Sequence, residues 1–384
     1  GDGDMSQCSV RSRESKLVRE LKGVQEALVV GIDVHKRSYA VAFVRASSRA
    51  VAAGITMPAD VKALGRLLGR VREQLHLCVY EAGPTGFGLA RALQALGLPV
   101  GVVSLGSIPR ATGQDNKTDP IDARRLAEYA AGGLLRCIAV PTEKEDEERQ
   151  LLRHRAKARK DLTKAKNRIK MFLLYNGIKE PKGLGQWSVS AVAELERMTL
   201  RGLLREELDM LLSALRFAKS HLASYEALVR RLAKRGDHTE DCRRLREIPG
   251  VGLLTAMTVQ VELFCPQRFH RPEQVARYAG LCPRLKQSGQ TSSTAQLTTN
   301  GNRHLRHVLI QSAWRWVRQD ATARARYEHL RERTGCAQKA IVGVARKLVM
   351  IMWRMLVDRT RYKPSVAGAT PAPAAPARPT PAAT

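Results

Sequence analysis

This chain of 384 residues has few acidic residues, no long apolar runs and no closely spaced cysteine pairs, and each of these scarcities excludes some classes of protein. Acidic residues are few, because 36 Asp and Glu stand against 65 Lys and Arg, which gives a formal net charge of +29. No apolar run approaches the ~18 residues of a membrane-spanning helix, and no secretory signal is recognisable. Positive charge without a membrane span favours nucleic acid over an anionic membrane as the partner. We therefore expect a protein that binds nucleic acid and no membrane.

Closely spaced cysteine pairs are also missing. The seven cysteines are scattered and none forms a C-x-x-C motif, which argues against a zinc site and fits a reducing compartment. The length predicts two or three domains, and a hydrophobic content of 44% is enough to form real cores.

The few acidic residues in apolar or helix-opening positions are therefore conspicuous. Asp33 lies inside the apolar run 27–34, and Glu81 ends a second apolar run, 75–81. Asp119 and Asp122 open a predicted helix and lie three residues apart, so they share one face. Four such carboxylates predict a site for Mg²⁺, a hard ion that prefers oxygen ligands and substrate phosphates.

Each of these carboxylates also has a simpler interpretation. Asp119-Pro-Ile-Asp122 is a good helix start on its own, with Asp at the N-cap and Pro at the first helical position. Asp33 can be a capped residue at a strand end. A buried Asp is rare without a partner or a metal, however, and the combination of the four favours the metal site.

The first part of the chain alternates predicted strands and helices, which indicates an α/β domain over 27–140 after an N-terminal extension, 1–26. Three strands come first, then helices and strands in turn: Val29–Val34, Ser38–Val44, Ala50–Thr56, a helix Ala59–Leu75, the strand Leu75–Glu81, a helix Gly88–Leu96, the strand Pro99–Ser104 and a helix from Asp119 to about Ala131. Three antiparallel strands followed by βα units match the order of an RNase H-like fold.

A long basic helix is predicted from Thr142 to about Asn176. Its apolar seam follows steps of four and three residues, at Leu151, Arg155, Ala158, Leu162, Ala165, Ile169 and Phe172. With a second helical stretch over 200–235, it predicts an antiparallel coiled-coil hairpin, 141–236, that can dimerise. The basic residues between the seam positions either contact nucleic acid or form a solvated face, and the lack of acidic partners favours contact. The predicted contacts are Arg153, Lys157, Lys160, Lys164 and Arg168.

The rest of the sequence is predicted to form a helical C-terminal domain, 237–362, followed by a disordered Ala/Pro-rich tail, 363–384. The segment from Arg246 to Gly252 resembles a helix-hairpin-helix, in which Gly250 and Gly252 allow backbone N–H groups to approach a DNA phosphate. The alternative is an ordinary Pro-Gly turn between two helices.

A polar loop around Ser288 lies further along this domain. Arg284 and Lys286 precede the serine, and Arg303 and Arg306 follow it. A serine beside a glycine is usually only a turn residue, but cationic neighbours would stabilise charge that develops on a phosphate under attack. His35, His304 and His307 are expected to be exposed histidines of a basic patch, not metal ligands or bases.

Taken in order, these motifs resemble the IS110/IS1111 transposases, the DEDD recombinases. The resemblance rests on Asp33-Val-His-Lys36, Tyr80-Glu-Ala-Gly-Pro-Thr-Gly86, Lys117-Thr-Asp-Pro-Ile-Asp122-Ala-Arg-Arg-Leu-Ala127, Ile248-Pro-Gly-Val-Gly252, Gly280-Leu-Cys-Pro283, Ser288-Gly289 and Thr299-Asn-Gly-Asn-Arg303. It implies a RuvC-like domain, a coiled-coil insertion and a C-terminal transposase domain. It further implies that Asp33, Glu81, Asp119 and Asp122 are a metal-binding tetrad and that Ser288 is the nucleophile.

The same resemblance implies the partners: donor and target DNA, a non-coding guide (bridge) RNA, and a dimer, or a tetramer in the synaptic complex. The sequence departs from the family's usual Ser-Ser-Gly-Gly stretch at Gln287 and Gln290. Ser292 or Ser293 can therefore compete with Ser288 for the nucleophile role.

Two other functions stay open from the sequence. One is a Mg²⁺-dependent nuclease of the Holliday-junction type, in which Ser288 is structural. The other is a non-catalytic nucleic-acid-binding protein, for which the four carboxylates would be dispensable.

Overall fold

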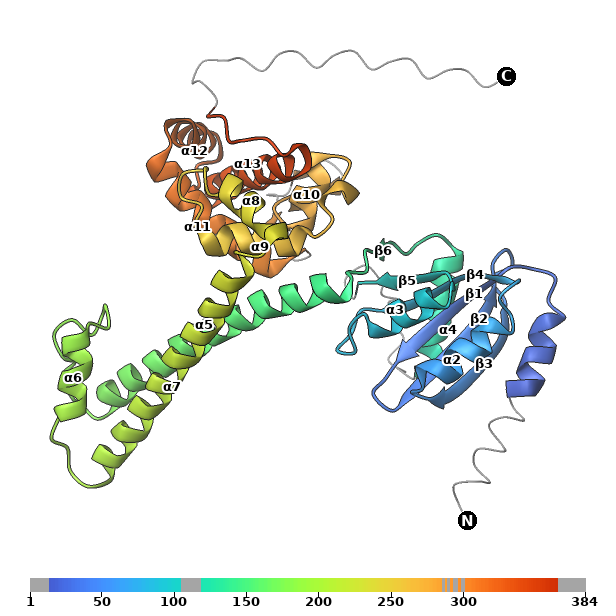
Figure 1. Cartoon of the computed structure of the whole chain (residues 1–384), viewed down its shortest axis with the longest axis horizontal. Helices are drawn as coiled ribbons and strands as arrows, with labels where there is room; N and C mark the ends of the chain where they lie inside the picture. Colours follow the sequence, from blue (N-terminus) through green and yellow to red (C-terminus); the bar gives the residue numbers. More distant parts are fainter. Residues whose placement is uncertain are drawn as a thin grey trace. The chain divides into compact units, whose positions relative to one another are not determined.

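The computed structural model describes residues 14–104, 119–284 and 301–364, with the short strand segments 287–288, 291–292 and 296–297 between them. The chain divides into two compact units, Gly1–Glu143 and Lys144–Thr384. The first carries a mixed sheet with helices on both faces, and the described part of the second is mainly helical (Figure 1).

The sheet of the first unit has the strand order β3-β2-β1-β4-β5-β6. Its strands are β1 (Leu28–Val34), β2 (Ser38–Arg45), β3 (Val51–Pro58), β4 (Leu75–Glu81), β5 (Val100–Val103) and β6 (Cys137–Ile138). The first three pair antiparallel, β1, β4 and β5 pair parallel, and β6 runs antiparallel to β5. This is the predicted RNase H-like order, and it confirms the α/β class of this unit.

Side chains alternate between the two faces of the sheet. One face carries Leu28, Val30 and Ile32 of β1 into a core with α2 (Val61–Gly69) and α3 (Gly88–Ala95). A further helix over residues 14–22 adds three side chains to this core: Leu17, Val18 and Leu21. The opposite face packs against α4 (Asp119–Ala131), where Ala123 of α4 meets two alanines of β2, Ala40 and Ala42.

The predicted helix Ala59–Leu75 is wrong in its extent. Helix α2 ends at Gly69, and a turn leads from there to Leu75, where β4 begins. The chain must turn here because the N–H of Leu28 donates to the carbonyl of Gln74, which starts the pairing of β1 with β4.

The second unit begins with two long helices that share a core. Helices α5 (Glu143–Tyr175) and α7 (Leu203–Leu232) run side by side, and α6 (Val189–Arg197) packs against them (Figure 1). Five predicted seam positions of α5 are buried in this core: Ala158, Leu162, Ala165, Ile169 and Phe172. Arg155, which interrupts the apolar seam, forms an ion pair with Glu226 of α7.

In its described residues, the rest of the second unit packs six α-helices around a second core. These are α8 (Gly236–Leu245), α9 (Leu253–Leu263), α10 (Pro272–Tyr278), α11 (Arg303–Gln319), α12 (Ala321–Thr334) and α13 (Ala337–Asp358). Leu152 of α5 belongs to this core as well, so α5 contributes to both. Within the described residues, no helix combines the length and apolar character needed to cross a bilayer.

Candidate functional site

The carboxylates Asp33 and Glu81 lie at the same edge of the sheet. Strands β1 and β4 are parallel neighbours, and Ile32 is paired with Tyr80, so the next residue on each strand is Asp33 or Glu81. Because side chains alternate along a strand, Asp33 shares a face with Gly31, and Glu81 shares one with Val79. That face is the one covered by α4, since Val79 packs against Leu126 of α4.

Helix α4 reaches β1 because Gly31 has no side chain. A Cβ atom at Gly31 would lie 2.0 Å from the carbonyl oxygen of Ala123 and 2.7 Å from the backbone nitrogen of Ala127. This contact holds the first turns of α4, which carry Asp122, against the strand that carries Asp33. The side chain of Asp119 lies outside the described residues.

The loop after Glu81 is fixed by its neighbour, Tyr80. The hydroxyl of Tyr80 donates to the carbonyl of Gly86 at 3.1 Å and accepts from the N–H of Ala90 at 3.3 Å. Burial raises the pKa of the Tyr80 phenol, so it stays a neutral donor. The N–H of Ala82 also donates to Val103 on β5. Glu81 therefore projects from a well-braced strand end.

Two cationic or titratable side chains flank the carboxylates. Nε2 of His35 lies 3.0 Å from Oδ2 of Asp33, and Nη1 of Arg125 lies 4.0 Å from Oδ1 of Asp122. The histidine was expected in an exposed basic patch. Its side chain is indeed exposed, at 49%, and it pairs with the Asp33 carboxylate.

The donor set fits a hard divalent cation, because Asp33, Glu81 and Asp122 all offer carboxylate oxygens. Within the described side chains, which leave out Asp119, no three His, Cys, Asp or Glu residues come close enough together to hold a metal ion. A Mg²⁺ site here would thus need the fourth carboxylate or a bound phosphate to complete it.

The backbone around Ser288 forms a small β-hairpin. Strand β8 (Gln287–Ser288) pairs antiparallel with β9 (Thr291–Ser292), with Ser288 opposite Thr291. Outside it, β7 (Pro283–Arg284) pairs with β10 (Gln296–Leu297). Lys286 and Ser293, and the side chains of the four strands, lie outside the described residues.

The two ends of this loop meet at a pair of glycines. Gly280 has φ +68° and Gly301 has φ +108°, and a Cβ at Gly301 would lie 2.6 Å from the Cα of Gly280. Arg306 packs over Gly280, and burial together with the nearby charge of Arg303 lowers the pKa of its guanidinium. We call residues 281–301, between these contacts, the serine loop.

The predicted contacts of α5 separate into two kinds. All five side chains are exposed: Arg153, Lys157, Lys160, Lys164 and Arg168. Arg153 also forms a two-point ion pair with Glu262 of α9, at 2.8 and 2.9 Å. Its guanidinium is therefore engaged by Glu262, although the side chain remains 42% exposed.

Gly250 has a packing role that the sequence did not indicate. Its φ is +82°, and a Cβ there would lie 2.7 Å from the Cβ of Arg315 and 2.8 Å from the nitrogen of Trp316 on α11. Gly252, at the N-cap of α9, has open space around it. Only Gly252 thus leaves room for a phosphate to approach this turn.

Sequence reasoning missed Glu262, a carboxylate of the second unit with four side-chain partners: Arg149, Arg153, Asn302 and His304. Its exposed fraction is 0%, and its partners come from α5 and α11. His304 is one of these partners, with its Nδ1 3.4 Å from Oε1 of Glu262, although the sequence predicted an exposed histidine. One signal was present: Glu262 is the lone charged residue in the helix Leu253–Leu263.

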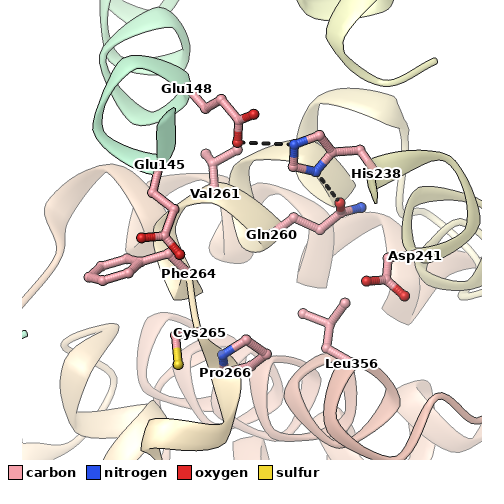
Figure 2. A pocket seen from close by; sticks show the side chains of 10 residues that line it. All are labelled: Glu145, Glu148, His238, Asp241, Gln260, Val261, Phe264, Cys265, Pro266 and Leu356. Carbon is pink, nitrogen blue, oxygen red and sulfur yellow. Dashed lines mark hydrogen bonds and ion pairs between the residues drawn. The ribbon is translucent and has the colours of Figure 1, made fainter. Parts of the chain in front are cut away.

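A second, partly buried cluster lies at the start of α5. His238 of α8 stands between Glu148 and Gln260, each 3.0 Å from one of its ring nitrogens (Figure 2). The hydrogen bond with Glu148 is the main cause that raises the pKa of His238. With Glu262, this cluster joins α5 to the C-terminal helices.

Two family models match the chain. A model for DEDD transposases of the IS110 type matches residues 30–175, and one described as "Transposase IS116/IS110/IS902 family" matches residues 242–328. The chain belongs to the IS110 family of transposases. The first match spans the sheet with Asp33, Glu81 and Asp122, and the second spans the helices around the serine loop.

Individual relatives agree with this family. The protein y4qE of Sinorhizobium fredii is 29% identical over 75% of this IS110-family chain and 70% of its own length. The transposase for the element IS1111A of Coxiella burnetii is 28% identical, over 71% of this chain and 75% of its own. Among solved structures, T. thermophilus RuvC with a Holliday junction substrate aligns over 29% of this chain and 100% of its own, at 12% identity and a TM-score of 0.22. The fold assignment rests on the strand order, not on that alignment.

Proposed function

We propose that this IS110-family transposase cuts and rejoins DNA with two sets of groups, a Mg²⁺-binding carboxylate tetrad and a serine nucleophile. The observation that carries the proposal is the convergence of Asp33 and Glu81 at one edge of the sheet, on the face that α4 covers. Asp122 and Asp119 open that helix. A purely architectural DNA-binding protein has no need of carboxylates gathered to face a phosphate backbone.

The tetrad is the part of the site that would hold Mg²⁺. Asp33, Glu81 and Asp122 supply oxygen donors from three adjoining elements, and Asp119 is the fourth member. Bound Mg²⁺ would polarise the scissile phosphate and neutralise charge that develops on it. The protein's own contribution is to fix the donors, through the strand pairing, the Tyr80 hydroxyl and the close contact at Gly31.

Ser288 is the proposed nucleophile. Its hydroxyl would attack a DNA phosphodiester and form a phosphoserine bond as a strand oxygen leaves, and a hydroxyl of the partner strand would later reseal the DNA. This step conserves bond energy that hydrolysis would lose. The paired strands β8 and β9 support the role, because a nucleophile on a hairpin is held more tightly than one on an open loop.

Nucleic-acid binding follows from charge and exposure. Four of the exposed cations of α5, Lys157, Lys160, Lys164 and Arg168, give a basic helix face that suits a phosphate backbone. Arg303, exposed in the first turn of α11, adds charge beside the serine loop. The proposed partners are donor and target DNA and a non-coding guide RNA, bound by a homo-oligomer in the bacterial cytoplasm, at the nucleoid.

The test compares three variants in one recombination assay with the element's own DNA ends and the RNA that co-purifies with the protein. Asp122→Asn should abolish strand cleavage, and Ser288→Ala should abolish the covalent protein–DNA adduct. Glu73→Gln, an exposed carboxylate of the same unit, is the control and should leave both unchanged.

The outcomes separate the competing functions. Cleavage without an adduct in the wild-type protein would assign a Mg²⁺-dependent junction nuclease in which Ser288 is structural. An adduct that persists in Ser288→Ala but disappears in Ser292→Ala would move the nucleophile to Ser292. Undiminished recombination by Asp122→Asn would exclude the metal site.

A further inference from the structure

Glu262 joins three segments that lie far apart in the sequence. Its Oε1 accepts from Nε of Arg153 at 2.8 Å, and its Oε2 accepts from Nη2 of Arg153 at 2.9 Å and from Nδ2 of Asn302 at 2.7 Å. Nε of Arg149 lies 3.4 Å from Oε2, and Nδ1 of His304 lies 3.4 Å from Oε1. One carboxylate thus binds α5 and α11 to α9.

The charge of Glu262 is kept despite full burial. Burial alone would raise the pKa of its carboxyl, but hydrogen bonds from His304 and Arg153 and the charges of Arg153 and Arg149 outweigh that effect and hold the pKa far below its ordinary value. A buried charge is tolerated only when its partners satisfy it fully. The arrangement is therefore specific in its geometry, because moving any one partner leaves an uncompensated charge.

Glu262 is also bonded to the residues that flank the serine loop on both sides. At the end of the loop, Asn302 donates from its side chain to the carboxylate of Glu262 and caps α11 by accepting from the N–H of Leu305. Just before the loop, the hydroxyl of Tyr278 donates to the backbone carbonyl of Glu262 at 2.9 Å. The N–H of Asn302 donates in turn to the carbonyl of Tyr278 at 2.8 Å, which closes the loop at its base.

We propose that Glu262 is a positioning residue that locks the base of the serine loop to the basic helix α5. The lock then fixes the position of the hairpin that carries Ser288 relative to nucleic acid bound along the exposed cations of α5. The role of Glu262 in catalysis rests on the proposed function of Ser288, whereas its bonds to Asn302 and Arg153 do not. Glu262 acts through other residues and contacts no substrate itself.

Asn302 allows the lock to be opened without removing the helix cap. In Asn302→Ser the hydroxyl can still cap α11, because Ser is as good an N-cap as Asn, but it is too short to reach Glu262. In Asn302→Asp the cap is also kept, and a second carboxylate is placed against Glu262. Asn167→Ser, the same exchange at an exposed position of α5, is the control.

The first readout is adduct formation by the full chain with its co-purified RNA and the element's own DNA ends. The free energy of a hydrogen bond to a charged group corresponds to a factor of about ten to a hundred in a rate or equilibrium constant. Asn302→Ser should therefore slow adduct formation by about tenfold. DNA affinity should stay near that of the wild-type protein and of Asn167→Ser, whereas the melting temperature should fall, because a buried carboxylate loses a partner; the adduct rate is therefore measured at a temperature at which the variant is fully folded. An unchanged adduct rate in Asn302→Ser would overturn the proposal, and so would a loss that disappears at temperatures at which the variant is fully folded.

The second readout is the pH profile of Asn302→Asp, taken at a temperature at which the variant stays folded at every pH, so that a change in stability alone leaves the profile unaltered. Its adduct rate relative to wild type should be lowest at neutral pH and recover as the pH falls, because the introduced carboxyl then becomes protonated and can donate to Glu262. No recovery on acidification would overturn the proposed lock.

Failure of the lock and failure of the serine chemistry are distinguishable. If Ser288→Ala forms the adduct as well as wild type, the nucleophile assignment fails. The lock is then still judged by hydrogen exchange at the N–H of Asn302, which should rise at least tenfold in Asn302→Ser; unchanged exchange would overturn it.

Discussion

Gly31 of β1 lies directly beneath the carbonyl oxygen of Ala123 on α4, with only 2.0 Å between that oxygen and the place where a Cβ atom would be. The contact lies two residues before Asp33 and one residue after Asp122. It fixes how close the opening of α4 comes to the strand end, and hence how far apart the carboxylates of these two elements are held. A missing side chain thus defines the geometry of the proposed metal site.

Replacing Gly31 by Ala should separate α4 from the sheet. The added methyl group meets backbone atoms of Ala123 and Ala127, which cannot move aside as a flexible side chain can. We expect a loss of about 1–3 kcal/mol in the free energy of unfolding, as for other overpacked sites, and loss of strand cleavage. Thermal unfolding and a DNA-cleavage assay measure the two effects.

Gly54→Ala is the matched control, because it lies in the same sheet and its nearest neighbour, the carbonyl oxygen of Val41, would be 3.5 Å from the new atom. It should retain cleavage. Equal activity of Gly31→Ala and Gly54→Ala would show that the close contact does not define the site.

The strands and helices of the first unit were predictable because their patterns are local. Alternating or continuous apolar residues indicated β1, β2 and β4, and Asp119-Pro120 indicated the start of α4. The end of α2 was not predictable, because apolar spacing continues through Val71 and Leu75 while the chain turns to pair with β1. That pairing is a tertiary contact that the periodicity of one segment does not contain.

The residues of the candidate sites likewise fall into those that local sequence patterns indicated and those that they did not. Asp33, Glu81 and Asp122 were selected from the sequence by residue type and position, and the parallel pairing of β1 with β4 brings the first two to one edge. Their role as a metal site stays a prediction, as do Ser288 and the domain boundaries within the second unit. Glu262 was missed because its importance comes from partners on α5 and α11, which no local pattern relates to α9.

The hydroxyl of Tyr80 braces the loop that follows Glu81. Tyr80→Phe leaves the carbonyl of Gly86 and the N–H of Ala90 without this partner. We expect the free energy of unfolding to fall by about 1 kcal/mol, and cleavage to slow more than DNA binding weakens, because Glu81 is less well held. Cleavage rates at saturating DNA test this; a rate equal to wild type would show that the loop does not position Glu81.

His238 should make stability depend on pH. Its hydrogen bonds with Glu148 and Gln260 raise its pKa in the folded protein above the ordinary value near 6.5. A raised folded-state pKa gives stabilisation that is fully present below the unfolded pKa and is lost as the pH rises through the folded one. The melting temperature should therefore fall on raising the pH through that range.

His238→Gln isolates this contribution, because the amide can still hydrogen-bond but carries no titrating charge. The difference in melting temperature between wild type and His238→Gln should be largest at pH values below about 6.5 and shrink in alkaline solution. His270→Gln, on a short surface segment after α9, controls for general effects of losing a histidine. A difference that stays constant with pH would show that Glu148 does not hold His238 in its charged form.

An apolar stripe on α7 should carry self-association. Leu203, Met210 and Phe217 recur at intervals of seven residues and are 78%, 66% and 70% exposed, so they form a second seam on the side of the helix that no part of the described chain covers. Burying two such side chains stabilises a complex by about 1.5–3 kcal/mol each.

The double variant Met210→Ser with Phe217→Ser should therefore weaken dimerisation by at least tenfold in sedimentation equilibrium. The control Leu134→Ser, at an exposed leucine of the first unit, should leave dimerisation unchanged. Equal dimerisation of both proteins would place the interface elsewhere, and a loss of transposition only in the stripe variant would show that transposition requires assembly through α7.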